Sequence, residues 1–368
     1  MKSLIVISIL SSLLINSHNT NREIRIEVLP ENVITYKEKS SWVLNFDFWF
    51  GNYDSKDYTL NYINVKVFSK AGDLLTRRHL SNNGLPGAIS ILNRELNLGK
   101  DLYLFNPFSK FPEEVYPYKL VYTFVFNDVE VQKTIYPKLL NPKTRLQLPV
   151  TEKVYIDDGN DYFSHHRRVS LNSDAAKALN MTKLAQRFAL DFTKIDSLGN
   201  KGSGEIKNNQ DWYGWGMKVV SPAAGTVLEV RNNVPDNKYE GGQLIYSEEV
   251  KNQVSSDIST GNYVIIDHEN GEYSLLCHFQ NGTIQFEKGE KINLGDYLGN
   301  VGLSGDTYYP HLHYQVQTSP DIIDSYGIPA KFNDFFWVTQ QDNYVISGFI
   351  NSGDIVKPNY AQQKLNRQ

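Results

Sequence analysis

The sequence predicts an all-β protein built from two domains. Apolar and polar residues alternate over many short runs, which is the period of half-buried strands, and residues typical of turns separate these runs. The chain of 368 residues is long enough for two domains at a typical size of about 150 residues each. One short helix is expected over residues 172–186, with Asn172 or Ser173 as its N-cap.

The composition excludes several classes of partner and cofactor. Lysine and arginine number 37 against 41 aspartates and glutamates, so the net charge of −4 provides no basic field to bind nucleic acid. The single cysteine excludes an intramolecular disulfide framework and thiolate-rich zinc or iron–sulfur sites. Any metal ion must therefore be held by histidine and carboxylate side chains.

The first residues have the pattern of a secretory signal peptide. Lys2 precedes an apolar run from Leu4 to Ile15, and small or polar residues follow the run. The run is short for a bilayer span, and no later stretch reaches about 18 apolar residues. We therefore expect residues 1–18 to direct export to the periplasm, cell envelope or exterior, and the mature chain to lack a transmembrane segment. An uncleaved membrane anchor is the alternative.

Residues 20–138 predict a β-sandwich. Two runs place bulky apolar side chains at every second position, as on the buried face of a strand. Such strands over about 110 residues fit an immunoglobulin-like fold that lacks the cysteine pair of antibody domains. Residues 139–149 follow as a linker or an extended crossover. The two runs are Leu44, Phe46, Phe48 and Phe50, and Tyr118, Leu120, Tyr122, Phe124 and Phe126.

Residues 150–358 form the second, β-rich domain, and residues 359–368 a polar tail. The clearest chemical signal in this domain is the segment PHLHY at residues 310–314. On a strand, His311 and His313 project from one face while Leu312 faces the core. Such an imidazole pair suits a metal site, and two solvent-facing histidines are the alternative.

His278 is a further candidate. It ends a predicted strand that pairs with residues 261–268 across a turn containing Asn270 and Gly271, which is a hairpin signal. A purely structural role is the alternative for this histidine. Strand alternation predicts that Cys277 faces away from His278 as a core thiol, and His268 beside the turn is expected at the surface.

Asp191 lies in an otherwise apolar segment, RFALDF at residues 187–192. An isolated carboxylate there would lose much of its solvation, so a cation must lie beside it. One candidate is Arg187, four residues earlier on the same face of the predicted strand, and a metal ion is the other. His165 and His166 upstream complete the set of candidate ligands.

Several fragments of the second domain occur in a characteristic order. They are RFALDF at 187–192, VSPAAGTV at 220–227, PDN at 235–237, GNYV at 261–264, CHF at 277–279, the glycine-bounded segment 289–299, GLSG at 302–305 and PHLHY at 310–314.

In this order the fragments, spread over most of residues 160–318, resemble the lysostaphin-like or LytM-type zinc metallopeptidases, which cleave peptide bonds in peptidoglycan. The resemblance implies a duplicated-hybrid-motif-like domain whose antiparallel sheet forms a groove with Zn²⁺ on its floor. It also implies that peptidoglycan peptides are the substrate. A non-catalytic cell-wall binding or regulatory protein with the same fold is the alternative.

The resemblance also implies roles for individual residues. Asp191 and His313 correspond to zinc ligands, and His278 and His311 to the catalytic histidines, with the division of labour between those two left open. The family pattern has a histidine four residues before the aspartate, where this chain has Arg187, a side chain that stays protonated and cannot bind zinc. On the resemblance we expect His166, in preference to His165, to supply the third ligand.

Overall fold

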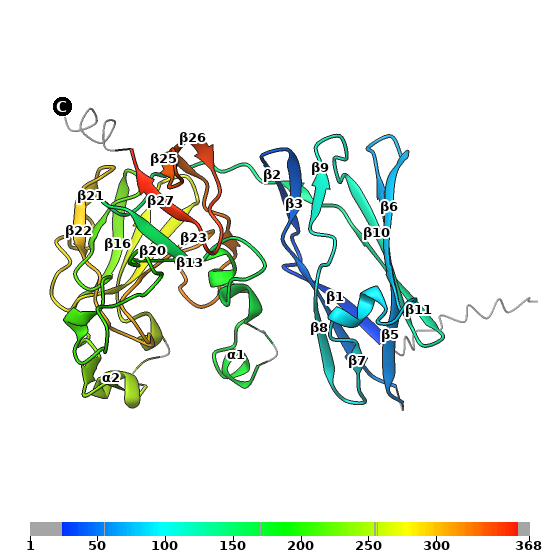
Figure 1. The fold of residues 1–368 in the computed structure, drawn as a ribbon, viewed down its shortest axis with the longest axis horizontal. Helices are drawn as coiled ribbons and strands as arrows, with labels where there is room; N and C mark the ends of the chain where they lie inside the picture. Colours follow the sequence, from blue (N-terminus) through cyan, green and yellow to red (C-terminus); the bar gives the residue numbers. More distant parts are fainter. Residues whose placement is uncertain are drawn as a thin grey trace, which may run out of the picture. The chain divides into compact units, whose positions relative to one another are not determined.

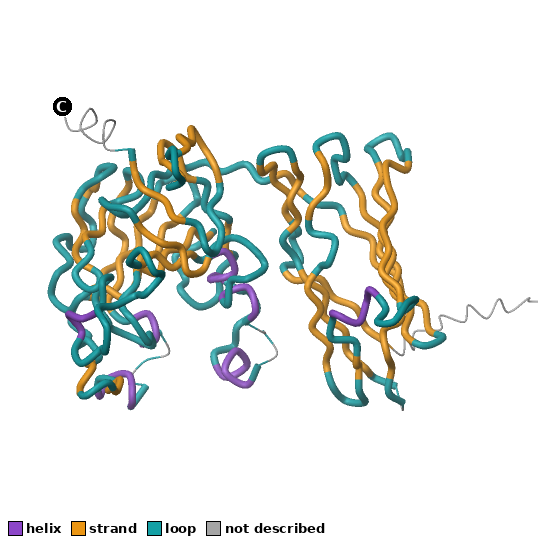
Figure 2. The backbone as a smooth tube through the Cα atoms, viewed as in Figure 1, coloured by secondary structure: helices purple, strands orange, loops and turns teal. Residues whose placement is uncertain are grey.

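The computed structural model describes residues 24–359 except 55, 170, 172, 254 and 256. Strands and loops make up nearly all of this part of the chain (Figure 2), which confirms the all-β prediction. Among the described residues, none of the helices has the length and apolar character needed to cross a membrane. The predicted signal peptide and most of the polar tail lie outside the described residues. The helices are η1 (Ala88–Ile91), η2 (His166–Arg168), α1 (Asp174–Ala178), η3 (Ala185–Phe188), η4 (Asn209–Asp211), α2 (Glu248–Lys251) and η5 (Ile258–Thr260).

The chain forms two compact units that interleave along the sequence. The first unit contains residues 24–31, 47–108 and 117–136 of the described chain. The second contains residues 32–46, 109–116 and 137–359. The domain limits predicted from the sequence stay a prediction.

The first unit packs two antiparallel sheets against each other. Phe48 and Phe50 on β4 meet Tyr122 and Phe124 on β10, and the Phe48–Tyr122 and Phe50–Phe124 ring centroids lie 4.8 and 4.9 Å apart. These edge-to-face contacts favour close packing of aromatic rings. The sandwich is as predicted, and its immunoglobulin-like assignment stays a prediction. One sheet has the order β1 (Ile24–Leu29), β4 (Asp47–Asn52), β8 (Asp101–Phe105), and the other β11 (Val129–Ile135), β10 (Lys119–Phe126), β5 (Tyr58–Phe68), β6 (Leu74–Ser81), with β7 (Glu95–Leu96) paired to β5.

The predicted apolar run from Leu44 to Phe50 is not one strand. Strand β3 (Ser41–Leu44) ends before Asn45, and β4 begins at Asp47. Asn45 leaves the ladder because its side-chain amide donates to the carbonyl oxygen of Asn160 at 2.7 Å. The alternation of apolar residues in the sequence therefore continues across the interruption of the strand at Asn45.

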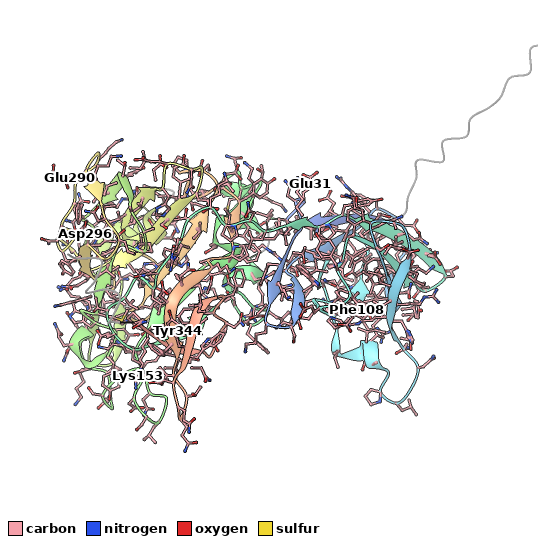
Figure 3. All side chains as sticks on the ribbon, turned by 90° about the horizontal axis from the view of Figure 1, so that it is seen from above. Glu31, Phe108, Lys153, Glu290, Asp296 and Tyr344 are labelled. Carbon is pink, nitrogen blue, oxygen red and sulfur yellow. The ribbon has the colours of Figure 1, made fainter. Side chains whose placement is uncertain are left out.

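The second unit is built on a large antiparallel sheet whose strands differ in length (Figure 1). The hairpin of β25 (Phe332–Trp337) and β26 (Asn343–Gly348) at one edge of this sheet carries Tyr344 (Figure 3). The Tyr344 hydroxyl donates to Asp334 Oδ1 at 2.8 Å. The strand order is β21 (Lys291–Ile292), β16 (Gly225–Arg231), β19 (Asn262–Asp267), β20 (Tyr273–Phe279), β23 (Leu312–Gln317), β14 (Leu190–Thr193), β13 (Val154–Asp158), β27 (Ile355–Pro358), β25 (Phe332–Trp337) and β26 (Asn343–Gly348), with β24 (Gly327–Ile328) paired to β23.

Three smaller sheets complete the second unit. Tyr36 of one of them packs on Phe349, with ring centroids 4.3 Å apart. The sheets have the orders β12 (Lys138–Leu139), β2 (Ile34–Glu38), β3 (Ser41–Leu44), β9 (Lys110–Pro112); β15 (Lys218–Val220), β22 (Tyr297–Asn300); and β17 (Lys238–Glu240), β18 (Gln243–Ile245).

The main core of the second unit lies on one face of the large sheet. Leu190, Phe192, Leu312 and Tyr314 point into this core from neighbouring strands. Leu146 and Leu148, in the segment predicted as a linker or extended crossover, are buried in the same core. Because side chains alternate along a strand, the residues between these apolar ones occupy the opposite face.

The predicted hairpin is confirmed, whereas the predicted helix is much shorter than expected. Strands β19 and β20 pair across the turn at residues 268–272. Of residues 172–186, only Asp174–Ala178 form α1, and the Ser173 hydroxyl accepts a hydrogen bond from the Ala176 amide as the predicted cap. Asn180 adopts a left-handed conformation with φ 52°, which ends the helix.

His268 was expected at the surface, and that prediction is wrong. The residue is only 9% exposed. Its Nδ1 donates to the carbonyl oxygen of Ala224 at 2.9 Å, and its Nε2 accepts from the Ser274 hydroxyl at 2.8 Å. Burial lowers the pKa of His268, against the opposing effects of the Ala224 carbonyl, Glu272 and Asp267.

The turn at Gly302–Gly305 provides a test of the fold. Gly305 has φ +86°, and a Cβ there would lie 2.4 Å from Ser259 O, whereas Gly295, with φ +81°, has no atom within 4 Å of that position. Alanine at either site introduces left-handed strain of about 1–2 kcal/mol. Overpacking adds about 1–3 kcal/mol at Gly305 alone. We expect Gly305→Ala to lower the free energy of unfolding more than Gly295→Ala, as measured by chemical denaturation. Equal losses in the two variants would contradict the close approach of Ser259 O to Gly305.

The buried histidine provides a second test, by pH. An unfolded histidine takes up a proton near pH 6.5, while folded His268 resists protonation. The unfolded state therefore binds more protons below about pH 6.5, and stability is lost as the pH falls toward the folded pKa. We expect His268→Gln to reduce the slope of stability against pH between 5 and 6.5 by up to on the order of 1 kcal/mol per pH unit. An unchanged slope in denaturation curves would contradict the neutral, buried state.

Candidate functional site

Three of the sequence-predicted site residues, Asp191, His311 and His313, meet through the pairing of central strands. Asp191 on β14 lies directly opposite His313 on β23, and His313 lies opposite Cys277 on β20. His311, which immediately precedes β23, lines the same pocket as His313. These residues occupy the face of the sheet that is opposite to the main core, as the alternation along each strand requires.

A bulge in β20 turns His278 toward this pocket. Asn262 pairs with Phe279 and Tyr263 with Cys277, so His278 is an extra residue on its strand, as in a β-bulge. It adopts φ 64°. The sequence prediction that Cys277 and His278 face opposite sides is wrong, because both line the pocket. The bulge shifts the alternation by one residue.

His166 reaches the pocket from a turn of 3₁₀ helix that an aspartate holds in place. Asp158 accepts hydrogen bonds from the backbone amide of His165 at 2.5 Å and from His165 Nδ1 at 2.7 Å. His166 follows in η2, with its Nε2 3.1 Å from Asp191 Oδ1 and its Nδ1 3.2 Å from Gln186 Oε1. The side chain of His165 is 57% exposed, whereas that of His166 is 6% exposed.

One carboxylate oxygen is the common point of the cluster. Asp191 Oδ1 lies 3.1 Å from His166 Nε2, 3.3 Å from His313 Nδ1 and 3.5 Å from His311 Nε2. Burial raises the pKa of Asp191, but the nearby His311, His166 and His313 lower it by a larger amount, so the pKa lies well below its usual range. The carboxylate is therefore ionised although it is buried.

The histidines opposite this carboxylate form a second pair. The rings of His278 and His311 lie 4.9 Å apart. Burial, followed by the nearby His311 and His313, lowers the pKa of His278 well below its usual range. His278 is thus a neutral imidazole at neutral pH.

The atoms of the cluster fit a zinc ion. Two tetrahedral ligand atoms that each lie about 2.1 Å from zinc are separated by about 3.4 Å. The two shortest separations from Asp191 Oδ1, to His166 and His313, are close to this value. A second group, Asp158, His165, His166 and Asp191, has ligand atoms within 4.8 Å of one another, but both oxygens of Asp158 already bind His165.

Arg187 does not fill the role of partner to Asp191 that the sequence allowed. It lies in η3, before the strand begins, and not on one strand face with Asp191. Its guanidinium donates from Nη2 to Asn45 Oδ1 at 3.1 Å. The 3₁₀ turn at residues 185–188 removes Arg187 from the alternation that the sequence suggested.

The pocket has a cavity volume of about 560 Å³ and a polar rim next to His311. Tyr309 lies 4.9 Å from the His311 ring, and its hydroxyl donates to Asp157. Lys201 pairs with the same carboxylate and lies 3.9 Å from the centroid of the Tyr309 ring. Tyr309 is therefore held by a fixed charge pair at the edge of the pocket.

Sequence reasoning missed four polar residues of the site. Gln315 and Gln317 continue the row of His311 and His313 at every second position, so strand alternation could have identified them. Asp158 carries no such signal, because Asp157 is an extra residue between Ile156 and Asp158 in the pairing of β13 with β14. Tyr309 carries none because it lies in the loop before β23.

Part of this domain is similar to known peptidases. Residues 212–325, which include His278, His311 and His313, match Peptidase family M23. The chain is 25% identical over 130 residues to the cell division protein DipM of Caulobacter vibrioides, covering 35% of this chain and 17% of that protein. It is 28% identical over 140 residues to the peptidoglycan DD-endopeptidase ShyC of Vibrio cholerae, covering 37% of this chain and 27% of that protein.

The matched segments thus span less than a third of either relative's length. The catalytic domain of lysostaphin from Staphylococcus simulans aligns with a TM-score of 0.23 and 13% identity, over 48% of this chain and 86% of that domain. The family match thus covers residues 212–325 of this chain, a segment that contains three histidines of the pocket.

Proposed function

We propose that the chain is an exported zinc-dependent endopeptidase that hydrolyses peptide bonds in peptidoglycan. The observation that carries the proposal is the ionised, buried carboxylate of Asp191 with three imidazoles within 3.5 Å of one oxygen. A neutral fourth histidine, His278, lines the same pocket. The match of residues 212–325 to a peptidase family supports peptide hydrolysis, and the likeness to ShyC supports peptidoglycan as substrate. The pattern of residues 1–18 supports export.

His166, Asp191 and His313 are the ligands in this proposal. Their three donor atoms suit Zn²⁺, which in catalytic sites takes three N or O ligands and keeps one position open. Gln186 Oε1 accepts a hydrogen bond from His166 Nδ1–H at 3.2 Å, which leaves Nε2 to bind the ion. His165 is a positioning residue, because its contacts with Asp158 hold the turn that carries His166.

His278 and His311 present the atoms that would move protons. His278 Nδ1 lies 2.8 Å from Ser304 O, and His311 Nδ1 lies 3.0 Å from Tyr309 O. A backbone carbonyl can only accept, so each Nδ1 carries the hydrogen and each Nε2 has a free lone pair. Zinc held by these ligands would lower the pKa of a water molecule and polarise the substrate carbonyl. One imidazole would accept the proton of the attacking water at Nε2, and the other, when protonated, would donate to the developing oxyanion.

The ligand assignment predicts different effects for two neighbouring histidines. His166→Ala should weaken zinc binding by more than about 100-fold, because a ligand is lost. His165→Ala should weaken zinc binding by no more than roughly 10–100-fold, which is typical for the loss of a residue that orients a metal ligand without binding the metal. Elemental analysis and competition with a chromogenic chelator measure both. Full zinc in His166→Ala together with loss in His165→Ala would overturn the assignment.

The catalytic assignment predicts loss of activity without loss of metal. His278→Ala and His311→Ala should each slow the release of peptide fragments from purified sacculi by about 10²–10⁴-fold, while zinc content stays that of the wild type. Mass analysis of the fragments identifies the bond cleaved. His79→Ala, at an exposed position of β6, is the matched control.

Two outcomes would contradict this assignment. Activity retained by both variants would exclude the two histidines from the reaction. A wild-type protein that sediments with sacculi and releases no fragments would favour the alternative, a non-catalytic wall-binding protein.

A further inference from the structure

Strand β23 continues past the two histidines with a row of buried amides. Gln315 is 2% exposed, and Gln317 is fully buried. Gln315 Oε1 lies 2.9 Å from His313 Nε2, and Gln315 Nε2 donates to Gln317 Oε1. Gln317 Nε2 in turn lies 2.8 Å from Ser319 O and 3.0 Å from Asp321 O. The side chains thus form one continuous chain of hydrogen bonds that ends on the backbone.

The backbone end fixes the direction of every bond in this chain. Ser319 O and Asp321 O are carbonyl oxygens, which accept only, so the atom of Gln317 that faces them must be its NH₂ group. The Gln317 carbonyl then faces Gln315 and requires a donor there. Gln315 consequently presents its own carbonyl to His313, and His313 must carry its hydrogen on Nε2.

We propose that Gln317 and Gln315 are positioning residues that set the tautomer of His313 and thereby leave its Nδ1 free to bind the metal. The inference rests on the proposed function, in which His313 is a ligand. Nδ1 is the atom that faces Asp191 Oδ1, at 3.3 Å. In a neutral imidazole only one nitrogen carries hydrogen, so a proton on Nε2 makes Nδ1 a lone-pair donor before any metal arrives.

The direct test is the tautomer of His313 in the metal-free protein. Long-range ¹H–¹⁵N spectra of labelled protein distinguish the two tautomers without zinc or activity. We expect the Nε2–H form in the wild type. Gln317→Leu removes the anchor and lets the Gln315 amide turn over, so the Nδ1–H form should appear. Zinc affinity, from chelator competition, should fall by about 10–100-fold.

A rescue variant separates polarity from packing. In the Gln317→Leu background, Gln315→Glu places a carboxylate beside His313, and a carboxylate accepts from Nε2–H whichever way it is turned. The double variant should recover the Nε2–H form and most of the zinc affinity. Gln285→Leu, which removes an exposed amide that donates to Thr283 O, should change neither. Gln315→Leu, which deletes the acceptor directly, replaces Gln317→Leu if the latter does not fold.

The proposal is overturned if Gln317→Leu and Gln315→Leu both keep the Nε2–H form and full zinc affinity, or if Gln315→Glu fails to restore them. A wild-type protein in which His313 has the Nε2–H form but which binds no zinc would instead overturn the proposed function. That result would still support the role of Gln315 and Gln317 in setting the tautomer. The two failures are therefore distinguishable in the same set of samples.

Discussion

The buried carboxylate of Asp191 is the constraint on which the second unit depends. It is 1% exposed and lies on a central strand, with β13 on one side and β23 on the other. An ionised group at such a position is costly unless charge or hydrogen bonds compensate it. His166, His311 and His313 lie within 3.5 Å of one of its oxygens, and they lower the pKa of the carboxyl group. Because three segments far apart in sequence must converge on one oxygen, the site can form only when the central strands are paired in register.

Strand alternation alone does not build this site, and two local irregularities complete it. The regular rows on β14 and β23 present Asp191, His313, Gln315 and Gln317 on one face while Leu190, Phe192, Leu312 and Tyr314 fill the core. The extra residue at His278 turns an imidazole from the core face to the pocket. The extra residue at Asp157 leaves Asp158 opposite Asp191, where it can hold the His165–His166 turn. Bulges of this kind re-aim side chains next to functional sites.

These features explain how much could be predicted from the sequence. Period-two alternation predicted the buried stripe of β10, the shared face of His311 and His313, and the hairpin of β19 and β20. It was wrong for Cys277 and His278, and for the run from Leu44 to Phe50, because a bulge and the Asn45–Asn160 hydrogen bond interrupt the period. Neither event has a local signal, since each depends on a partner distant in sequence. The same reason explains His268, whose partner Ala224 is 44 residues away.

The position of Arg187 bears on how the proposed site gains its third ligand. A histidine four residues before Asp191 would need only local structure to reach a metal, but here that place lies in η3 and the guanidinium turns to Asn45. His166 is 25 residues before Asp191, so something must fix the intervening chain. Asp158 does so through two hydrogen bonds to His165, and Asp158 pairs with Asp191 across the strands. The strand pairing that positions Asp191 therefore also positions Asp158, and through it the turn that brings the His166 imidazole to the carboxylate from a distant part of the sequence.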